Sequence, residues 1–307
     1  MTDQRNRRSA QIDCLIVGGG PAGLAAATYL GRFRRRVVVF DAGESRARLI
    51  PMTRNCPGFP DGISGADLLS RLRQQALLNG AELRDEAIRD IEHDGTEFLV
   101  ASPSSVRARA VLLATGVVDT LPDIPSTTDM IRSGTMRLCP ICDGYEVIDK
   151  RVGVMGPVKE AAKKAVFLQT YTRNVTVLAT DSASDIAGGS GPLIQEAGIQ
   201  IETCIPHSLR PLGEKAAVLL SNGTTSIFDS VYPAMGCTTG AKLGIDLGAT
   251  CDDLGYLVVD AHQQTAVPGL YAAGDVVNEI NQIAVAFGHA AIAATDIHNR
   301  LSDANCF

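Results

Sequence analysis

The apolar residues of the chain gather into short continuous runs, and most of these runs are followed by a glycine turn and a helix-like stretch. The first run, residues 12–17, shows no regular polar alternation, which is typical of a strand buried on both faces of a parallel sheet. It leads into three successive glycines, a proline and the small-residue stretch AGLAAATYLG. Similar patterns predict strands at residues 37–40, 152–155 and 175–178 and within the segments 108–116 and 265–276, and a small-residue helix at residues 284–301.

This alternation of strands and helices around glycine turns predicts an α/β fold with parallel sheets. Residues 12–41 and 150–181 share the order strand, glycine turn, helix, strand, so the chain contains a weak internal repeat of nucleotide-binding type. We therefore expect two Rossmann-like nucleotide-binding domains. The first is discontinuous, residues 1–120 plus 243–307, and the second is central, residues 121–242, with turn-rich linkers between them.

Composition and charge narrow the possible partners. The 307 residues are 45% hydrophobic and 20% charged, as in an ordinary globular protein, and the net charge is −6. This charge argues against nucleic acid or an anionic membrane as the main partner. The basic cluster Arg32 to Arg36 follows the first helix, where we expect solvated cations that complement the helix dipole. No targeting segment is apparent, so we expect a cytoplasmic protein.

The glycine turn after the first strand fits a dinucleotide fingerprint. Gly18, Gly20 and Gly23 have the G-x-G-x-x-G spacing, which permits a tight turn, a close approach of pyrophosphate and close packing of helix on strand. The helix that follows offers N–H donors to the phosphates. The second strand ends in Asp41, whose carboxylate can accept hydrogen bonds from both ribose hydroxyls. These features in register predict a bound dinucleotide.

The segment RLCPICDGYE contains the C-x-x-C pair Cys139 and Cys142. Such spacing serves zinc, haem attachment or dithiol chemistry. A zinc site needs a second pair of ligands at matching spacing, and haem attachment needs a histidine where Asp143 stands, so no metal is expected and dithiol chemistry fits best. The other cysteines within apolar or turn segments are interpreted as small hydrophobic residues: Cys14, Cys204, Cys237 and Cys251.

With these motifs the chain resembles the low-molecular-weight thioredoxin reductase family of two-dinucleotide flavoproteins, and CPICDG is the most specific mark. The resemblance implies that the first domain binds FAD, with Asp275 of the segment AAGDV at the ribityl and phosphate region and Gln282 beside the ring. The expected cofactor-binding residues are Gly18, Gly20, Pro21, Ala22, Gly23, Asp41, Ala42, Asn55, Ala114, Thr115, Gly116, Gly274, Asp275, Gln282 and Ile283.

The resemblance also implies a division of labour at the cysteines. Cys142 would face the flavin, Cys139 would exchange with the partner, and Asp143 would donate a proton. The expected partner is a thioredoxin-like protein or a small dithiol or disulfide, and we expect a homodimer. In the helix at residues 284–301, His289 is a further candidate base toward Cys139, and an ordinary structural hydrogen bond is the alternative. Terminal Phe307 is a candidate cover for the flavin face.

The central domain departs from the family pattern at its nucleotide site. Gly156 and Ala161 keep the first and last positions of G-x-G-x-x-A, but Val158 replaces the middle glycine. Pro157 removes an N–H donor, and Asp181 after the second strand would repel a phosphate where the family has cations for the 2′-phosphate of NADPH. These differences predict loss of ordinary NADPH use.

The alternative is a divergent but working site in which Lys159 replaces the missing cations, while Lys163 and Lys164 are expected on an exposed helical face. Without NADPH, ferredoxin, a second flavin or oxygen would be the redox partner, and the sequence does not choose among them. We therefore expect an FAD-dependent disulfide or dithiol oxidoreductase. The alternatives are an NADPH-dependent thioredoxin reductase and, from another class, a flavin-bound redox sensor without turnover.

Overall fold

The computed structural model describes residues 11–100, 105–181, 191–278 and 280–303. The chain divides into unit 1, Met1–Arg48 with Ala66–Val118 and Thr239–Phe307, and unit 2, Leu49–Gly65 with Asp119–Thr238. The sequence-based boundaries differ at residues 49–65, which they place in the first domain. This segment contacts the rest of unit 2 through an ion pair between Arg54 Nε and Glu146 Oε1 at 3.4 Å.

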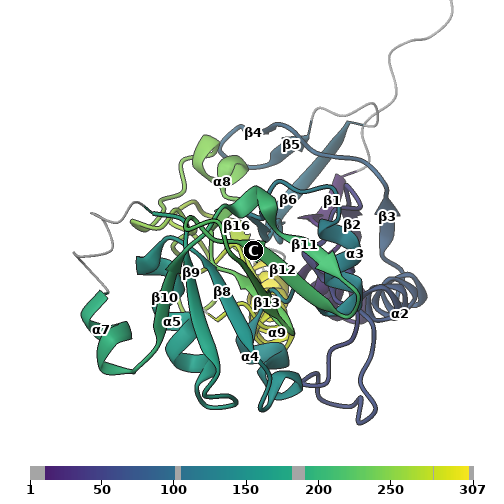
Figure 1. Ribbon diagram of the computed structural model, residues 1–307. Helices are drawn as coiled ribbons and strands as arrows, with labels where there is room; N and C mark the ends of the chain where they lie inside the picture. Colours follow the sequence, from purple (N-terminus) through teal and green to yellow (C-terminus); the bar gives the residue numbers. More distant parts are fainter. Residues whose placement is uncertain (1–10, 101–104, 182–190, 279, 304–307) are drawn as a thin grey trace, which may run out of the picture. The chain divides into compact units, whose positions relative to one another are not determined.

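Unit 1 is built on a sheet whose described strands follow the order β3-β2-β1-β6-β5-β4, with β16 paired to β6 (Figure 1). Strands β3, β2, β1, β6 and β16 are parallel, whereas β4 and β5 join as antiparallel neighbours. Their bounds are β1 (Gln11–Val17), β2 (Val37–Phe40), β3 (Glu82–Arg84), β4 (Ile91–His93), β5 (Phe98–Val100), β6 (Val106–Leu113) and β16 (Leu270–Ala272).

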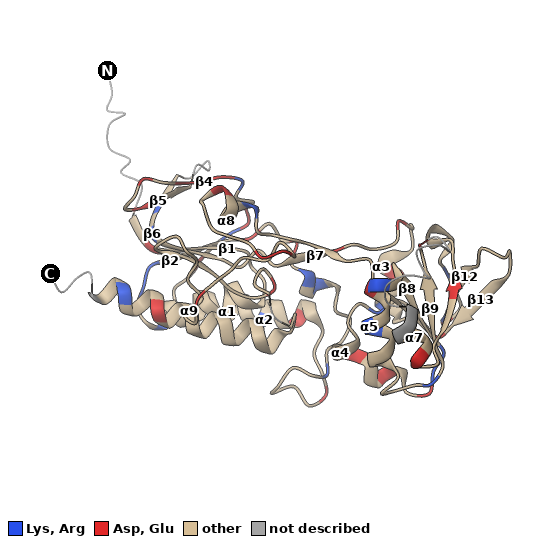
Figure 2. Cartoon of the chain, turned by 90° about the vertical axis from the view of Figure 1, so that its left-hand side faces the viewer, with Lys and Arg blue, Asp and Glu red and all other residues tan. Residues whose placement is uncertain are grey.

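The helical elements of unit 1 are α1 (Pro21–Arg32), η1 (Arg46–Leu49), α2 (Gly65–Leu78), α8 (Lys242–Asp246) and α9 (Ile283–Asp303). Helices α1 and α9 lie side by side along one face of the sheet (Figure 2). Both helices contain small buried residues, such as Ala26 and Ala290, and small residues allow packed helices to approach closely. The phenol of Tyr271 ties β16 to α9 by donating to Asp296 Oδ2 at 2.7 Å.

The basic cluster after α1 is only partly solvated. Arg32, Arg34 and Arg36 are exposed as expected, but the expectation is wrong for Arg35. Its guanidinium donates to the carbonyl of His298 at 2.8 Å and to Ser302 Oγ at 2.6 Å. Arg35 thereby joins the segment after α1 to the last turns of α9, where a cation also complements the helix dipole.

Unit 2 contains a parallel sheet in the order β10-β9-β8-β14 and an antiparallel sheet in the order β11-β12-β13. Its strands are β8 (Val152–Gly156), β9 (Val175–Ala179), β10 (Gln200–Thr203), β11 (Arg210–Leu212), β12 (Lys215–Leu219), β13 (Thr225–Phe228) and β14 (Ser230–Pro233). Its helical elements are α3 (Thr127–Ser133), α4 (Pro140–Asp143), η2 (Gly144–Val147), α5 (Val158–Leu168), α7 (Gly191–Glu196) and η3 (Pro206–Ser208). Strands β7 (Val117–Asp119) and β15 (Cys237–Thr239) pair where the chain passes from one unit to the other.

Strand alternation gives the parallel sheet of unit 2 two buried faces. Val152 and Val154 join one cluster with α5 residues such as Ala161, while Met155 and Leu178 join a second cluster with the antiparallel sheet. Successive side chains of a strand point to opposite faces, so an apolar run without polar alternation is required here. The strands predicted at 37–40, 152–155 and 175–178 are confirmed, as is the long helix near the C-terminus.

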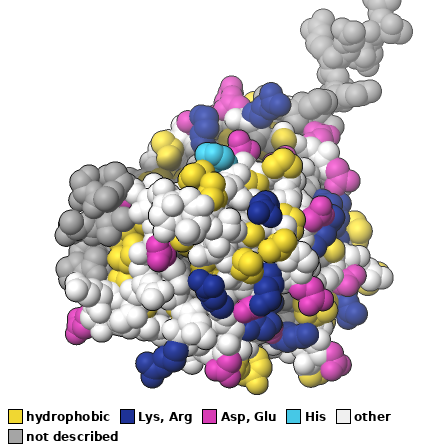
Figure 3. Space-filling model, viewed as in Figure 1, with side chains coloured by type: hydrophobic (Ala, Val, Ile, Leu, Met, Phe, Trp, Pro, Cys, Tyr) yellow, Lys and Arg dark blue, Asp and Glu magenta, His cyan; other side chains and the backbone are white. Residues whose placement is uncertain are grey.

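No described helix is long and apolar enough to cross a membrane. On the face of the molecule in Figure 3, acidic and basic side chains are interspersed. Charges of both signs side by side cancel at a distance, so this face presents no extended field of one sign.

Replacing Leu15 with alanine tests the core of unit 1. Leu15 lies in β1 and is 0% exposed, so L15A is expected to lower the free energy of unfolding by about 2 to 5 kcal/mol. Leu78, at the end of α2, is 79% exposed, and L78A is expected to change the free energy of unfolding by less than about 0.5 kcal/mol. Urea denaturation followed by circular dichroism measures both variants. Equal losses in the two would contradict the burial of β1.

Candidate functional site

The carboxyl ends of four parallel strands meet at one edge of the unit 1 sheet. Val17 pairs with both Phe40 and Leu113, and Leu113 pairs with Ala272, so β1, β2, β6 and β16 end level. The segments after these strands contain most of the predicted cofactor residues: 18–23, 41–42, 114–116 and 274–275. Ligands of open α/β sheets bind at such an edge.

Two glycines of the fingerprint are required by close contacts within the fold. A Cβ atom at Gly18, which has φ +112°, would lie 2.2 Å from the carbonyl oxygen of Ala114. A Cβ atom at Gly23 would lie 1.9 Å from the carbonyl oxygen of Gly18. Gly20 is different, because a Cβ there would meet only Ser45 Oγ, at 3.3 Å. Gly20 caps α1, so its missing side chain leaves the helix N-terminus open to a phosphate.

The two predicted carboxylates of this edge are both held by arginines. Asp41 is buried, accepts from the N–H of Gly43 at 2.9 Å and pairs with Arg73 at 2.7 Å. Asp275 pairs with Arg46 of η1 at 3.3 Å. Neither arginine follows a recognised motif, so the sequence did not reveal them; both come from elements whose position depends on the folded sheet.

The remaining unit 1 residues lie around this edge in several ways. Gly274 approaches the first turn of α1, because a Cβ there would lie 2.9 Å from Ala22 Cβ. Thr115 Oγ donates to the carbonyl of Gly240 at 2.8 Å. The other predicted positions are Pro21 at the start of α1, exposed Ala42, Ala114, Gly116, and Gln282 with Ile283 at the start of α9.

The donor set of unit 1 fits a dinucleotide. The N-terminus of α1 is open, Asp41 follows β2, and Asp275 follows β16 at the same edge of the sheet. In addition, the buried Oδ1 of Asn281 has no hydrogen-bond partner in the described part of the chain. A buried acceptor without a partner is costly in a finished protein, which agrees with a polar ligand beside it.

Two further predicted site residues have hydrogen-bond partners within the protein, and their roles stay predictions. Asn55 belongs to the segment 49–65 of unit 2, where its Oδ1 accepts from Thr53 Oγ at 2.8 Å. His289 is buried on α9, and its Nδ1 accepts from the N–H of Gly274 at 3.3 Å. This contact favours the alternative of a structural hydrogen bond for His289, and its role as a base stays a prediction. Phe307 lies outside the described residues.

Cys139 and Cys142 form a disulfide, with their Cα atoms 5.3 Å apart. Cys139 caps the short helix α4, and its Sγ accepts from the N–H of Cys142 at 3.1 Å. Pro140 occupies the first helical position, where its fixed φ favours the turn. A backbone N–H directed at the sulfur stabilises a thiolate on Cys139 more than one on a free cysteine.

Asp143 follows the disulfide directly and is largely buried. Burial raises the pKa of this carboxyl above its usual value, although nearby Arg137 and Tyr232 act in the opposite direction. Arg137 donates to Oδ2 at 3.1 Å and Tyr232 donates to Oδ1 at 2.9 Å. A carboxyl with a raised pKa beside two cysteines is suited to proton exchange with a thiol. Tyr232 lies in a buried strand far along the chain, so no local signal identified it.

The nucleotide unit of unit 2 repeats the backbone of unit 1 up to its first glycine. A Cβ atom at Gly156 would lie 2.2 Å from the carbonyl oxygen of Ala234, the same contact that Gly18 makes with Ala114. The N–H groups of Ala234 and Ala114 likewise donate to the ends of β8 and β1, at 2.7 and 2.8 Å. The two turns therefore have the same steric requirement.

The two helix N-termini differ. In α5, Pro157 is the cap residue, and Val158 is buried in the helix cluster. The N–H of Val158 donates to Asp181 Oδ2 at 2.5 Å. A carboxylate from the segment after β9 therefore already binds an N–H in the first turn of α5, whereas no side chain caps the N-terminus of α1.

The lysines of α5 do not share one role. Lys159 and Lys163 are exposed. The expectation of an exposed face is wrong for Lys164, whose ammonium donates to the carbonyl oxygens of Pro233 at 2.7 Å and of Leu138 at 3.4 Å. A long side chain can bury its stem while its charge binds carbonyls, and here it fixes the chain just before Cys139.

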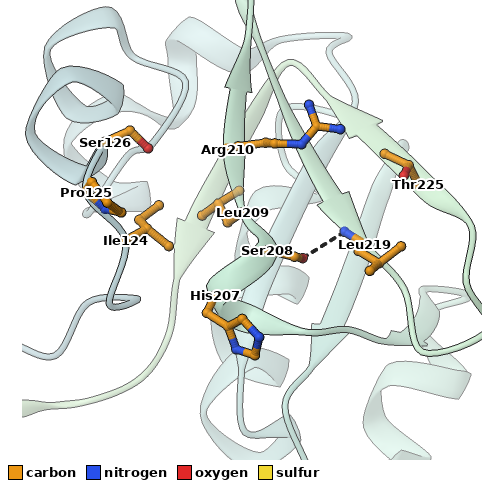
Figure 4. Close-up of a pocket in the computed structure, with 9 residues that line it drawn as sticks. All are labelled: Ile124, Pro125, Ser126, His207, Ser208, Leu209, Arg210, Leu219 and Thr225. Atoms are coloured by element: carbon orange, nitrogen blue, oxygen red, sulfur yellow. Dashed lines mark hydrogen bonds between the residues drawn. The ribbon is translucent and has the colours of Figure 1, made fainter.

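A separate cavity of about 530 Å³ lies on unit 2 between the start of α3 and the antiparallel sheet (Figure 4). Its lining combines apolar side chains with His207, Ser208 and Arg210. The hydroxyl of Ser208 is already used, since it donates to Ile205 O and accepts from Leu219 N. None of the predicted site residues lines this cavity.

Comparisons with known proteins agree with this geometry. A family model described as pyridine nucleotide-disulphide oxidoreductase matches residues 12–290. The thioredoxin reductase of Mycolicibacterium smegmatis is 28% identical over 95% of this chain and 97% of its own length. The bifunctional thioredoxin reductase/thioredoxin of Mycobacterium leprae is 29% identical, and the match spans 95% of this chain but only 66% of that protein. The crystal structure of thioredoxin reductase from Streptococcus pyogenes superposes with a TM-score of 0.87 at 26% identity, over 96% of this chain and 99% of the other.

Thiol labelling tests the environments of the cysteines. Burial raises the pKa of Cys204 to about 11, so at pH 8 only about one thiol in a thousand is ionised there, and burial also raises the pKa of Cys14. Cys237 is exposed, contrary to the sequence-based interpretation. Iodoacetamide at pH 8 is expected to modify Cys237 at least about 100-fold faster than Cys14 or Cys204, and Cys139 and Cys142 only after reduction.

Peptide mapping by mass spectrometry measures this order. Because the thiolate is the reactive form, labelling of Cys204 should rise as the pH approaches 11. Labelling of Cys204 at the rate of Cys237 would contradict its buried position.

Proposed function

The chain belongs to the pyridine nucleotide-disulphide oxidoreductase family, and on that premise we propose that it passes electrons between FAD, the Cys139–Cys142 pair and a thiol or disulfide partner without using NADPH. Its family, its fold and its similarity to thioredoxin reductases make it a thioredoxin reductase-like enzyme. The finer features, which are the electron donor or acceptor and the partner, rest on the geometry of the two units.

Unit 1 supplies the residues that would hold FAD. The open N-terminus of α1 would bind the pyrophosphate, Asp41 the adenosine ribose and Asp275 the ribityl region. Bound FAD supplies two-electron redox chemistry at its ring. Arg73 and Arg46 orient the two carboxylates, because each guanidinium is already paired with one of them.

The hydrogen bond from Val158 N–H to Asp181 supports the absence of NADPH use. A dinucleotide phosphate would have to displace this carboxylate and would meet its negative charge. Pro157 offers no N–H in exchange. Removal of a charge-assisted hydrogen bond costs about 1.5 to 3 kcal/mol, so a nucleotide would bind roughly 10- to 100-fold more weakly here than at an uncapped helix.

Three redox partners remain for the flavin: ferredoxin, a second flavin, or oxygen. Ferredoxin is acidic, and the exposed arginines after α1 are the cations that could dock it. On the thiol side we propose a thioredoxin-like protein or a small dithiol or disulfide, since relatives carry the name thioredoxin reductase. We propose further that the protein is a cytoplasmic homodimer.

The chain's own residues account for the thiol chemistry. The N–H of Cys142 stabilises negative charge on Cys139, which makes Cys139 the sulfur that exchanges with the partner. Cys142 would then be the sulfur on the flavin side, through which the same electron pair enters or leaves the cysteine pair. Burial raises the pKa of Asp143, so this carboxyl holds a proton more readily than a solvated carboxyl. It exchanges the proton that accompanies this transfer.

Anaerobic addition of NADPH to the purified flavoprotein tests the electron source. The flavin band is expected to stay unbleached with NADPH or NADH, because Asp181 occupies the helix N-terminus, and to bleach with dithionite or a dithiol. Rapid bleaching by NADPH would instead establish an NADPH-dependent thioredoxin reductase. A flavin content near two per chain would favour the second flavin as the redox partner.

The double variant V158G/D181A removes both obstacles at the start of α5. It is expected to gain NADPH-driven flavin reduction by at least about tenfold, since the freed N–H groups can bind a phosphate. The matched control is D246A, which removes an exposed carboxylate paired with Lys242 in unit 1 and should gain nothing. Spectrophotometric traces with saturating NADPH measure all three proteins.

Replacing Cys139 or Cys142 with serine separates an enzyme from a sensor. Each variant is expected to retain flavin but to lose at least about 100-fold of steady-state exchange with thioredoxin disulfide or a small dithiol, because one sulfur of the pair is missing. C237S is the control, since this exposed cysteine lies outside the pair. Absence of turnover in the parent protein, with the disulfide still reducible by the flavin, would establish the sensor instead.

A further inference from the structure

Two side chains that follow no sequence motif converge on the carboxyl of Asp143. Tyr232, which is fully buried in β14, donates to Oδ1 at 2.9 Å, and its hydroxyl also lies 3.3 Å from the carbonyl oxygen of Asp143. Arg137, two residues before Cys139, donates to Oδ2 at 3.1 Å. Each carboxyl oxygen is therefore bound by a different side chain, and the Tyr232 donor reaches Asp143 from a distant part of the chain.

Strand β14 organises both contacts. Ser230 and Tyr232 are two residues apart in a strand, so their side chains leave the same face. Ser230 Oγ accepts from Arg137 Nε at 3.4 Å and donates to the carbonyl of Gly134 at 2.7 Å. The backbone of Arg137 also donates to Val231 O at 3.0 Å. The segment before the disulfide is thus fixed along β14, and Asp143 is fixed with it.

The groups that face Asp143 carry opposing charges. Arg137 and Tyr232 stabilise the ionised carboxylate, whereas Glu146 of η2 disfavours it by like-charge repulsion. One oxygen of Glu146 pairs with Arg54, and the other is buried without a hydrogen-bond partner among the described residues. On α4 the facing titratable groups are the sulfurs of Cys139 and Cys142 once the disulfide is reduced.

We propose that Tyr232 and Arg137 are positioning residues that hold the Asp143 carboxyl ready to exchange one proton with the cysteine pair. The inference rests on the proposed function, in which Asp143 is the proton donor. Tyr232 and Arg137 bind the carboxylate that remains after the proton has left, and Glu146 favours its return. Together they keep the group able to give and to regain a proton.

The step is defined for a small dithiol as reductant. A thiolate of the dithiol attacks Cys139 Sγ, a mixed disulfide forms, and the Cys139–Cys142 bond breaks with its electron pair going to Cys142. The carboxyl of Asp143 gives its proton to the Cys142 thiolate and becomes a carboxylate. The second thiol of the dithiol, as thiolate, displaces Cys139, the dithiol leaves as a disulfide, and its released proton returns to Asp143 through solvent.

The experiment measures reduction of the disulfide by dithiothreitol, anaerobically, in the flavin-containing protein, across pH. The reaction is quenched with iodoacetamide, Cys142 labelling is quantified by mass spectrometry, and rates are divided by the dithiothreitol thiolate concentration. The corrected rate is expected to fall as pH rises through the Asp143 titration, and we call this decrease the pH limb. The D143N variant should show no such limb. The readout does not depend on turnover with the flavin.

The variants are expected to move this limb in opposite directions. Y232F and R137Q each remove a donor to the ionised carboxylate, so the limb should move up by about 0.5 to 1 pH unit. E146Q removes a neighbouring negative charge, so the limb should move down. A merely structural role for these residues would change the rates but would leave the limb at its parental pH.

The matched control is Y271F. Tyr271 is also a buried phenol that donates to a carboxylate, Asp296, but it lies in unit 1. Its removal should leave the limb unchanged. Circular dichroism establishes folding, and because Arg137 and Glu146 are partly exposed, R137Q and E146Q test the proposal even where Y232F folds poorly.

A limb at the parental pH in the folded variants would overturn this inference while leaving Asp143 as the proton donor. A D143N variant that keeps both the limb and the rate would instead refute the proton role of Asp143 in the proposed function, and this inference with it. Shifts of opposite sign in R137Q and E146Q, absent in Y271F, would support the inference.

Discussion

Close approach of a glycine to a strand-end carbonyl is the constraint on which both nucleotide units depend. Gly18 lies against Ala114 and Gly156 against Ala234, at positions where any side chain would overlap the oxygen. This contact sets where the chain leaves the strand and where the next helix begins. Because this contact is the same in the two units, the difference between their helix N-termini comes from residues that follow the turn.

The difference arises at the helix N-terminus, where backbone N–H groups need acceptors. In unit 1, glycine at position 20 keeps this end open, and Asp41 and Asp275 follow β2 and β16 at the same edge of the sheet. In unit 2, Val158 N–H is bound by Asp181 from the adjacent strand. A helix end that is bound by a side chain of the same unit needs no ligand there for stability.

The cysteine pair depends on the same unit 2 scaffold. One helical turn brings the sulfurs together, and this much follows from local spacing. The residues on either side of the pair are held by hydrogen bonds from distant side chains. Lys164 donates to the carbonyl before Cys139, and Tyr232 donates to Asp143. The β14 strand of unit 2 therefore belongs to the sheet of the second nucleotide unit and also holds the residue that follows the cysteine pair.

The sequence by itself determined the strands, the long C-terminal helix, the glycine positions and the C-x-x-C turn, because each follows from local periodicity or from short-range sterics. It also identified Val158 and Asp181 as departures from the family pattern. Only the tertiary structure decided that Asp181 caps Val158, that Arg35 and Lys164 bind carbonyls instead of water, and that Tyr232 meets Asp143. The physical reason is that hydrogen bonds between residues far apart in the chain depend on strand order and register, which leave no local trace in composition or spacing.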